Sequence, residues 1–263
     1  MKALVVIPTY NEIDSLPGAL DRVRDAVPET GILVVDDNSP DGTGALADAR
    51  AREDDRIHVL HRAEKNGLGP AYLAGFSWGL ASGYELICEM DADGSHRAED
   101  LALLIQRAEM ADEPDLVIGS RWVSGGATEG WDAKRIALSR GGNLYINAML
   151  GLRVKDATAG FRVYRASILR RLDLGGVEAL GYGFQVNMTK LVADVGGRIV
   201  EMPITFLERE AGQSKLSGGI FTEELGLVTK WGLAKRGAQL AEAVRKLDDR
   251  IGRPRADGRR RPP

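Results

Sequence analysis

Short apolar runs alternate with amphipathic stretches along the first 120 residues of the chain. Each run is six to eight residues long and rich in Val, Ile and Leu, which is typical of a buried strand. The runs cover residues 2–8, 31–37, 56–61, 84–91 and 114–120. Helix-like segments separate them, and this alternation predicts a doubly wound, mostly parallel α/β sheet of the Rossmann-like kind.

The pattern changes after residue 121, where a Gly-rich loop is followed by segments of mixed type. Helices are predicted over 134–150 and 184–196, short strands over 198–203 and 204–210, and a flexible loop over 211–219. A long helical pattern over 221–247 has most of its apolar residues on one side, namely Phe221, Leu225, Val228, Trp231, Leu233 and Leu240. We therefore expect one α/β domain over 1–217, an amphipathic helical extension over 218–250 and a disordered basic tail over 251–263.

Composition and charge add to this organisation without changing it. The chain has 263 residues and is 44% apolar, enough for one domain with a good core. The formal charge of −3 hides an asymmetry, because residues 228–263 hold eleven Lys and Arg against four Asp and Glu. One cysteine, Cys88, suits a reducing cytoplasm. We expect a cytoplasmic protein whose membrane contact is peripheral, since no apolar run approaches the roughly 20 residues that span a bilayer.

Polar groups follow the carboxyl ends of four predicted strands, at residues 8–12, 36–41, 91–95 and 119–121. In open parallel sheets the ligand site lies just past these ends. We therefore expect a binding site at this edge of the sheet.

Asp91 and Asp93 form the most chemically specific of these groups. If strand geometry persists, their side chains point to the same side and repel unless a cation lies between them. A pair of oxygen ligands favours Mg²⁺ or Mn²⁺. Two other interpretations exist for a D-x-D-G-S run: an aspartyl nucleophile with its acid/base partner, as in phosphatases of the haloacid dehalogenase type, or a turn that caps the next helix.

The order of acidic groups argues against the phosphatase. A phosphatase of that type has its nucleophile strand first, whereas here the pair Asp36 and Asp37 precedes Asp91 and Asp93. Asp37 and Asn38 are suited to bind a base or a ribose. We expect Asp41 and Thr43 to serve mainly in a turn and helix cap, and Asp36 fits either role.

Eight motifs together resemble the family 2 inverting glycosyltransferases, most closely the dolichol-phosphate and polyprenol-monophosphate mannose synthases. In order they are VVIPTYNE, VVDDNSPDGT, KNGLGPAYLAGF, MDADGSH, IGSRW, DATAGFRVYR, GYGFQVNM and EMPITFLEREAGQSKLS, and they extend from residue 2 to residue 217. The resemblance implies a GT-A fold, a nucleotide-sugar donor expected to be GDP-mannose, a divalent metal (Mg²⁺ or Mn²⁺), and a polyprenyl phosphate acceptor at a membrane surface, with no role for nucleic acid. It leaves room for an integral membrane partner protein.

The resemblance also implies roles for individual residues. The donor nucleoside is expected to contact Pro8, Tyr10, Glu12, Val35 and Asp37. Asp91, the backbone of Ala92, and Asp93 match the metal and donor-phosphate site, and Arg121, Arg209 and Lys215 match basic residues around the phosphates. Asp91, Asp93 and Arg121 are the expected catalytic residues, and Arg135 and Ser139 fall where the acceptor phosphate is expected.

The expected product is a polyprenyl β-D-mannosyl phosphate, formed with inversion. Because a phosphate monoester is mostly dianionic at neutral pH, this reaction needs no strong general base. Two alternatives stay open: the same fold using a UDP-sugar such as UDP-glucose, and a catalytically silent nucleotide-sugar binding protein. The helix from residue 221 fits two interpretations equally, as a membrane-surface helix or as a helix packed on the domain.

Overall fold

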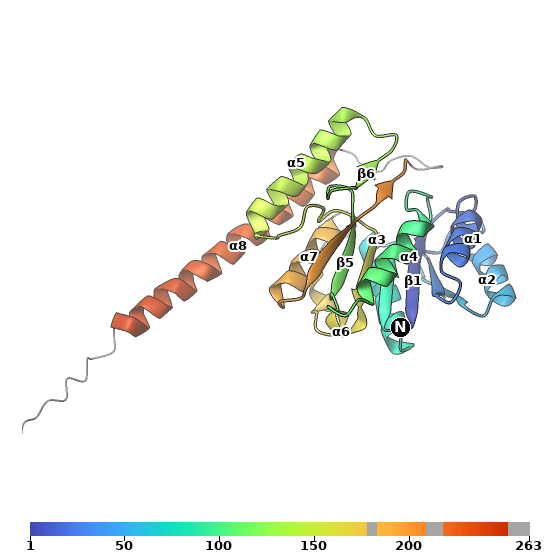
Figure 1. Ribbon diagram of the computed structural model, residues 1–263, viewed down its shortest axis with the longest axis horizontal. Coiled ribbons are helices and arrows are strands. Elements are labelled where there is room, and N and C mark those ends of the chain that lie inside the picture. The colour runs from blue at the N-terminus through green and yellow to red at the C-terminus, as the bar shows by residue number, and fades with distance from the viewer. Residues whose placement is uncertain (178–182, 209–217, 252–263) are drawn as a thin grey trace, which may run out of the picture.

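The computed structural model describes residues 1–177, 183–208 and 218–251, and the statements below concern these residues. A central sheet of seven strands has the order β3-β2-β1-β4-β7-β5-β8, with helices on both faces (Figure 1). The strands are β1 (Ala3–Thr9), β2 (Gly31–Asp36), β3 (Ile57–His61), β4 (Leu86–Glu89), β5 (Leu116–Ser120), β7 (Arg162–Arg165) and β8 (Ile199–Pro203); β6 (Ala127–Thr128) and β9 (Thr205–Phe206) pair separately. The helices are α1 (Leu16–Ala26), α2 (Thr43–Glu53), α3 (Leu68–Ala81), α4 (Ala98–Ala108), α5 (Ala133–Leu150), α6 (Ala166–Leu169), α7 (Gly183–Asp194) and α8 (Gly218–Ile251), with a 3-10 turn at Leu174–Gly176.

Both faces of the sheet are buried, which explains the uninterrupted apolar runs in the sequence. Side chains alternate along β1, so that Leu4 and Val6 join one core cluster while Val5 and Ile7 join the other. Parallel pairing of β1 with β2 and with β4 aligns their carboxyl ends at one edge. The five strands expected within the first 120 residues are confirmed, each within a few residues of its predicted bounds.

Strand β7 is the exception in direction and was not predicted. It lies between β4 and β5 and runs antiparallel to both. Its amino end therefore lies at the edge where the other strands have their carboxyl ends. The preceding loop, residues 156–161, is brought to the same edge as Asp91 and Arg121.

Strand β4 ends earlier than the sequence suggested. It stops at Glu89, so Asp91 and Asp93 lie in a turn rather than on a continuing strand. Gly94 has a positive φ of 79°, a conformation that glycine adopts without strain. The premise that strand geometry continues through the two carboxylates was wrong, and the turn now determines where they lie.

Helix α8 lies along α5 over part of its length and then projects beyond the domain (Figure 1). The Tyr145 and Thr229 hydroxyls are 2.6 Å apart, and Lys235 Nζ donates to the carbonyl of Leu150 at 2.8 Å. Val228 is buried against this surface, whereas Leu233 and Leu240 are exposed, so the expectation that these apolar residues share one packed face is only partly correct. Within the described ranges, no helix is both long and apolar enough to cross a membrane.

Candidate functional site

The loops after β1 and β2 interlock at the carboxyl edge of the sheet. The backbone N–H of Asn11 donates to Ser39 Oγ at 3.1 Å, and that of Glu12 donates to Thr43 Oγ1 at 3.0 Å. Asp41 accepts from the backbone and hydroxyl of Thr43, which confirms the structural role predicted for both. The helix cap itself is one residue off, because Gly42 is the N-cap of α2 and Thr43 is its first residue.

The adjacent acids Asp36 and Asp37 have different partners. Asp36 is buried and accepts from Thr9 Oγ1 at 3.1 Å and Ser39 Oγ at 2.6 Å, so its role, left open by the sequence, is structural. Asp37 accepts from Arg62 Nη1 at 2.7 Å. Burial raises the pKa of Asp37, and this outweighs the opposing effect of Arg62. Asp37 is thus held firmly at the end of β2.

The other residues expected at the nucleoside differ in how deeply they are buried. Tyr10 is half-buried, and the ammonium of Lys65 lies 3.8 Å from the centre of its ring. Pro8 and Glu12 are also half-buried, and Glu12 Oε2 accepts from Ser15 Oγ at 2.5 Å. The Val35 side chain is fully buried in the core, and the expected contact of this residue with the nucleoside stays a prediction.

Asp91 and Asp93 are positioned by separate hydrogen bonds in the turn after β4. Tyr72 on α3 donates its hydroxyl to Asp91 Oδ1 at 3.0 Å. Asp93 is buried, and its Oδ1 accepts from the Ser95 hydroxyl at 2.6 Å and from the Ser95 N–H at 3.1 Å. Because α4 begins only at Ala98, Asp93 does not cap that helix, and this alternative is excluded.

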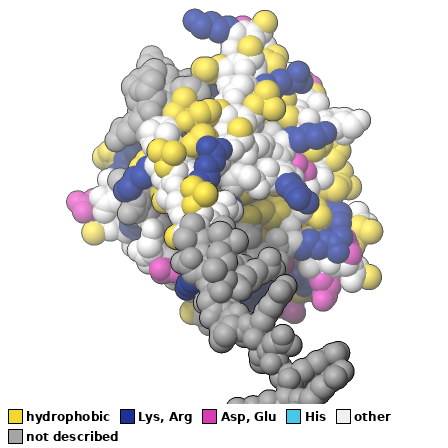
Figure 2. Space-filling model, turned by 90° about the vertical axis from the view of Figure 1, so that its left-hand side faces the viewer, with side chains coloured by type: hydrophobic (Ala, Val, Ile, Leu, Met, Phe, Trp, Pro, Cys, Tyr) yellow, Lys and Arg dark blue, Asp and Glu magenta, His cyan; other side chains and the backbone are white. Residues whose placement is uncertain are grey.

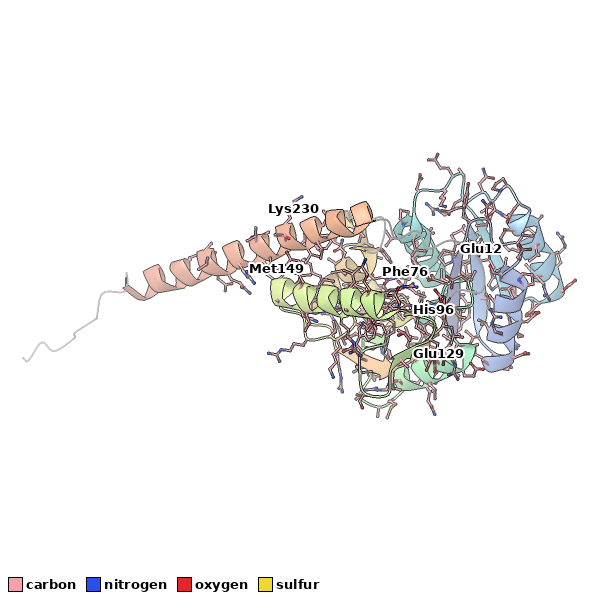
Figure 3. All side chains as sticks on the ribbon, turned by 90° about the horizontal axis from the view of Figure 1, so that it is seen from above. Glu12, Phe76, His96, Glu129, Met149 and Lys230 are labelled. Carbon is pink, nitrogen blue, oxygen red and sulfur yellow. The ribbon has the colours of Figure 1, made fainter. Side chains whose placement is uncertain are left out.

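His96 supports the same turn from inside the domain (Figure 3). Its Nδ1 accepts the backbone N–H of Asp91 at 3.2 Å, which leaves the ring's proton on Nε2 when the ring is neutral. The ring stacks on Phe161 at 4.6 Å and meets Phe206 edge-on at 5.5 Å. With only 2% of its surface exposed, His96 packs the turn from beneath.

The carboxylates of Asp91 and Asp93 suit a divalent cation that is also coordinated by a bound ligand. In the part of the chain that the structure describes, no group of three His, Cys, Asp or Glu side chains could form an all-protein metal site. Mg²⁺ and Mn²⁺ are commonly bound by one or two carboxylates together with substrate phosphates. Asp91 and Asp93 fit this second arrangement.

Arg121, at the end of β5, forms a buried ion pair with Asp156. Its Nε donates to Asp156 Oδ2 at 2.7 Å and its Nη2 donates to Oδ1 at 2.6 Å. Nη2 also donates to Thr158, and Asn143 Nδ2 lies 3.2 Å from the same hydroxyl. Burial would raise the pKa of Asp156, but the charge and hydrogen bonds of Arg121 outweigh burial and lower it.

Arg135 and Ser139 lie in the first two turns of α5, and Arg135 is close to Arg121. The Arg135 guanidinium stacks on Trp131 at 3.9 Å, and Arg121 approaches the same indole at 5.3 Å. Arg135 also lies 3.5 Å from Glu208. The structure thus brings Arg121 and Arg135 together through Trp131. Arg209 and Lys215 lie outside the described residues, as does the tail from residue 252.

Sequence reasoning missed the residues that hold the expected site residues in place. Asp156, Asn143, Tyr72 and Arg62 are all in this group. Asp156 and Tyr72 stand inside quoted motifs, so their presence was visible. Their partners were not, because β7 brings Asp156 to Arg121 across 35 residues of chain.

Comparison with known proteins includes a family match and relatives that align over most of this chain. Residues 4–173 match the family described as Glycosyl transferase family 2. Undecaprenyl-phosphate mannosyltransferase from Micrococcus luteus is 58% identical over 236 residues, which cover 90% of this chain and 96% of that protein. Polyprenol monophosphomannose synthase from Mycolicibacterium smegmatis is 50% identical over 236 residues, covering 89% and 88%.

Solved structures share the fold at much lower identity. Glucosyl-3-phosphoglycerate synthase from Mycobacterium tuberculosis, in complex with Mn²⁺, UDP and glucosyl-3-phosphoglycerate, has a TM-score of 0.60 at 19% identity and covers 97% of this chain and 81% of that chain. A mannosyltransferase from Pyrobaculum calidifontis, in complex with GDP-Man and Mn²⁺, has a TM-score of 0.54 at 18% identity and covers 92% and 75%. At these identities the likeness concerns the fold alone.

Proposed function

This chain belongs to glycosyl transferase family 2, and we propose that it transfers a mannosyl group from GDP-mannose to a polyprenyl monophosphate, giving a polyprenyl β-D-mannosyl phosphate. The predicted GT-A-like fold, a mostly parallel seven-stranded sheet with a C-terminal helix, is confirmed. The observation that carries the proposal is the near full-length similarity to the Micrococcus luteus mannosyltransferase. GDP as the donor nucleotide is the finer part of the proposal.

Donor binding is assigned to the β1, β2 and β4 ends of the sheet. Tyr10 and Asp37 are suited to the nucleoside, since one offers a ring face and the other a carboxylate acceptor. Asp91 and Asp93, with the backbone of Ala92, are the proposed holders of Mg²⁺ or Mn²⁺ on the donor diphosphate. When bound, such a cation offsets the diphosphate charge and acts as a Lewis acid towards the leaving group.

The chemistry that remains for the protein is to bring two anions together. The acceptor phosphate is already a nucleophile, so Arg135 and Ser139 need only bind and orient it, while Arg121 is assigned to the donor phosphates. In the structure, Arg121 Nε and Nη2 donate hydrogen bonds to Asp156. Nη1 is therefore the group that we propose donates to a phosphate oxygen. We assign Arg209 and Lys215 to the donor phosphates by motif alone.

Access to the lipid is proposed to occur by peripheral contact with a membrane. The face that carries α5 and α8 shows Lys and Arg among hydrophobic side chains (Figure 2). Leu144 on α5 and Leu240 on α8 are 72% and 68% exposed. A mixture of apolar and basic side chains suits the headgroup region of an anionic bilayer.

A donor panel tests the proposed reaction. The protein is incubated with undecaprenyl phosphate, Mn²⁺ and each of GDP-mannose, UDP-glucose and UDP-galactose, and lipid products are identified by mass spectrometry. The proposal expects a mannosyl lipid from GDP-mannose, and a product from a UDP-sugar instead would refute the donor assignment. The anomeric configuration of the product, read by NMR, tests inversion, which a retained α linkage would contradict.

A further inference from the structure

Two tryptophans beside the acceptor residues form an aromatic surface that the proposed function has not used. Trp122 follows Arg121 at the end of β5, and Trp131 precedes α5. Their ring centres lie 6.3 Å apart at a steep angle. Arg135 covers Trp131 at 3.9 Å, and Arg140 covers Trp122 at 4.8 Å. We call Trp122, Trp131, Arg135 and Arg140 the Trp–Arg ledge.

The ledge holds unused hydrogen-bond donors. The Nε1 atoms of Trp122 and Trp131 are shielded from solvent, and neither has a hydrogen-bond partner among the residues that the structure describes. A buried donor without a partner costs free energy, and native proteins rarely leave one without a function. Two such groups on adjacent indoles point to an acceptor supplied by a ligand, and an anionic oxygen is the strongest acceptor available.

The ledge also joins charge to apolar surface. Arg140 is exposed, and Leu138, between the two arginines in the chain, has 51% of its surface exposed. Indole faces and leucine bind hydrocarbon, whereas guanidinium groups bind phosphate. A ligand that matches this surface is an amphiphilic anion, with a phosphate at one end and a branched apolar chain attached to it.

Resting on the proposed function, we infer that the Trp–Arg ledge binds the phosphate-proximal part of the acceptor lipid: the rings of Trp122 and Trp131 contact the isoprene units, and their Nε1–H groups, together with Arg140, donate to the phosphate. The position of the ledge favours the acceptor lipid over the nucleotide-sugar donor as its ligand. The ledge contains Arg135, an expected acceptor-phosphate residue, whereas the residues suited to the nucleoside follow β1 and β2. Trp122 and Trp131 therefore determine acceptor specificity.

Kinetics separate acceptor binding from chemistry. In Trp122→Ala and Trp131→Ala we expect the KM for undecaprenyl phosphate to rise about tenfold or more, while kcat and the KM for GDP-mannose stay within about twofold. Arg140→Gln should raise the acceptor KM about threefold to tenfold. Trp78→Phe, at the far edge of the sheet beside His58, and Arg153→Gln, an exposed arginine after α5, are matched controls that should change none of these values.

Direct binding gives a readout that does not depend on activity. The chain has four tryptophans, so Trp78→Phe combined with Trp231→Phe leaves Trp122 and Trp131 as fluorescent reporters. Farnesyl phosphate should change their emission at concentrations at least tenfold lower than methyl phosphate, which lacks the chain, or farnesol, which lacks the phosphate.

The outcomes are distinguishable. Equal binding of methyl phosphate and farnesyl phosphate would overturn the isoprene contact, and a raised KM for GDP-mannose in the tryptophan variants would move the ledge to the donor side. If the wild-type protein makes no lipid product from any nucleotide sugar, the proposed function fails. The fluorescence titration then still decides whether the ledge binds an isoprenyl phosphate.

Discussion

Arg121 and Asp156 form a two-pronged ion pair that is closed off from solvent. The Asp156 side chain is fully buried, and the two contacts are 2.7 Å and 2.6 Å long. Asn143 and Thr158 complete the pair with hydrogen bonds to the same carboxylate. The guanidinium expected at the phosphates is therefore fixed by the loop before β7, and its position depends on that loop.

Replacing Asp156 with Asn should leave the Arg121 charge buried without a counter-ion. We expect a loss of about 3 kcal/mol in the free energy of unfolding, measured with urea, and strongly reduced transfer. The control is Asp21→Asn, which removes an exposed pair with Arg50 and should cost about 1 kcal/mol or less. An equal loss in the free energy of unfolding for the two variants would show that the buried ion pair stabilises the fold no more than the exposed one.

The same pair makes the stability of the fold depend on pH in the acid range. The pKa of Asp156 is lowered in the folded chain from an ordinary value of 3.8, so its ionised form stabilises the fold above that value. This contribution is lost as the pH falls through the lowered folded pKa. Urea unfolding at pH 6 and pH 3 should show a difference between wild type and Asp156→Asn that is large at pH 6 and shrinks at pH 3. A difference that does not change with pH would contradict the lowered pKa.

Asp93→Ala should abolish metal-dependent transfer. Removal of one of the two carboxylates proposed to hold the cation is expected to lower kcat by about a thousandfold or more, because several kcal/mol of transition-state stabilisation are lost. The measurement is initial rate against Mn²⁺ concentration, with Asp14→Asn, an exposed acid in the loop before α1, as the control. If Asp93→Ala kept full activity in the presence of a chelator, the assignment of the metal to this site would be wrong.

Tyr72→Phe tests how Asp91 is oriented. The change deletes only the hydroxyl that donates to Asp91 Oδ1 and keeps the buried ring, so the fold should persist. If Asp91 is a metal ligand as proposed, apparent Mn²⁺ affinity should fall about tenfold, as is usual when a hydrogen bond to a metal ligand is lost. Tyr84→Phe, whose hydroxyl lies 3.4 Å from His58 at the opposite edge, should leave Mn²⁺ dependence unchanged.

The contact between α8 and α5 can be opened at one glycine. A Cβ added at Gly232 would lie 2.8 Å from the Met149 carbonyl oxygen, so Gly232→Ala should cost about 1–3 kcal/mol and increase hydrogen exchange in α8. Gly237→Ala is the matched control, because nothing lies within 4 Å of its Cβ position and alanine is the better helix former by about 1 kcal/mol. Similar exchange in both variants would argue against tight packing at Gly232.

The fold was largely predictable from local patterns, since buried parallel strands have long apolar runs. β7 escaped prediction because Arg162, fully buried, stands where a core strand normally has an apolar residue. Its guanidinium is satisfied by the carbonyls of Ala157, Ala159 and Gln185 and by two hydroxyls. Pattern reasoning cannot anticipate such a solution, which needs three segments assembled around one side chain.

The sequence predicted which residues form the candidate site, but not which side chains bind one another there. Motif order placed Asp91, Asp93 and Arg121 at one edge of the sheet, and they lie there. That Asp156 binds Arg121, or that Tyr72 binds Asp91, depends on strand order, which sequence spacing does not contain. Whether α8 packs on the domain or only on a membrane was also undecided by its pattern, and the contacts of Thr229 and Lys235 place part of it on α5.

The projecting part of α8 has a hydrodynamic consequence. A helix of 34 residues is about 50 Å long, and its described hydrogen bonds to α5 end at Arg236, less than two-thirds of the way along. A compact body with such a rod attached tumbles anisotropically and diffuses more slowly than a sphere of the same mass. On a gel-filtration column the 28.4 kDa chain should elute earlier than a globular standard of its size, even as a monomer.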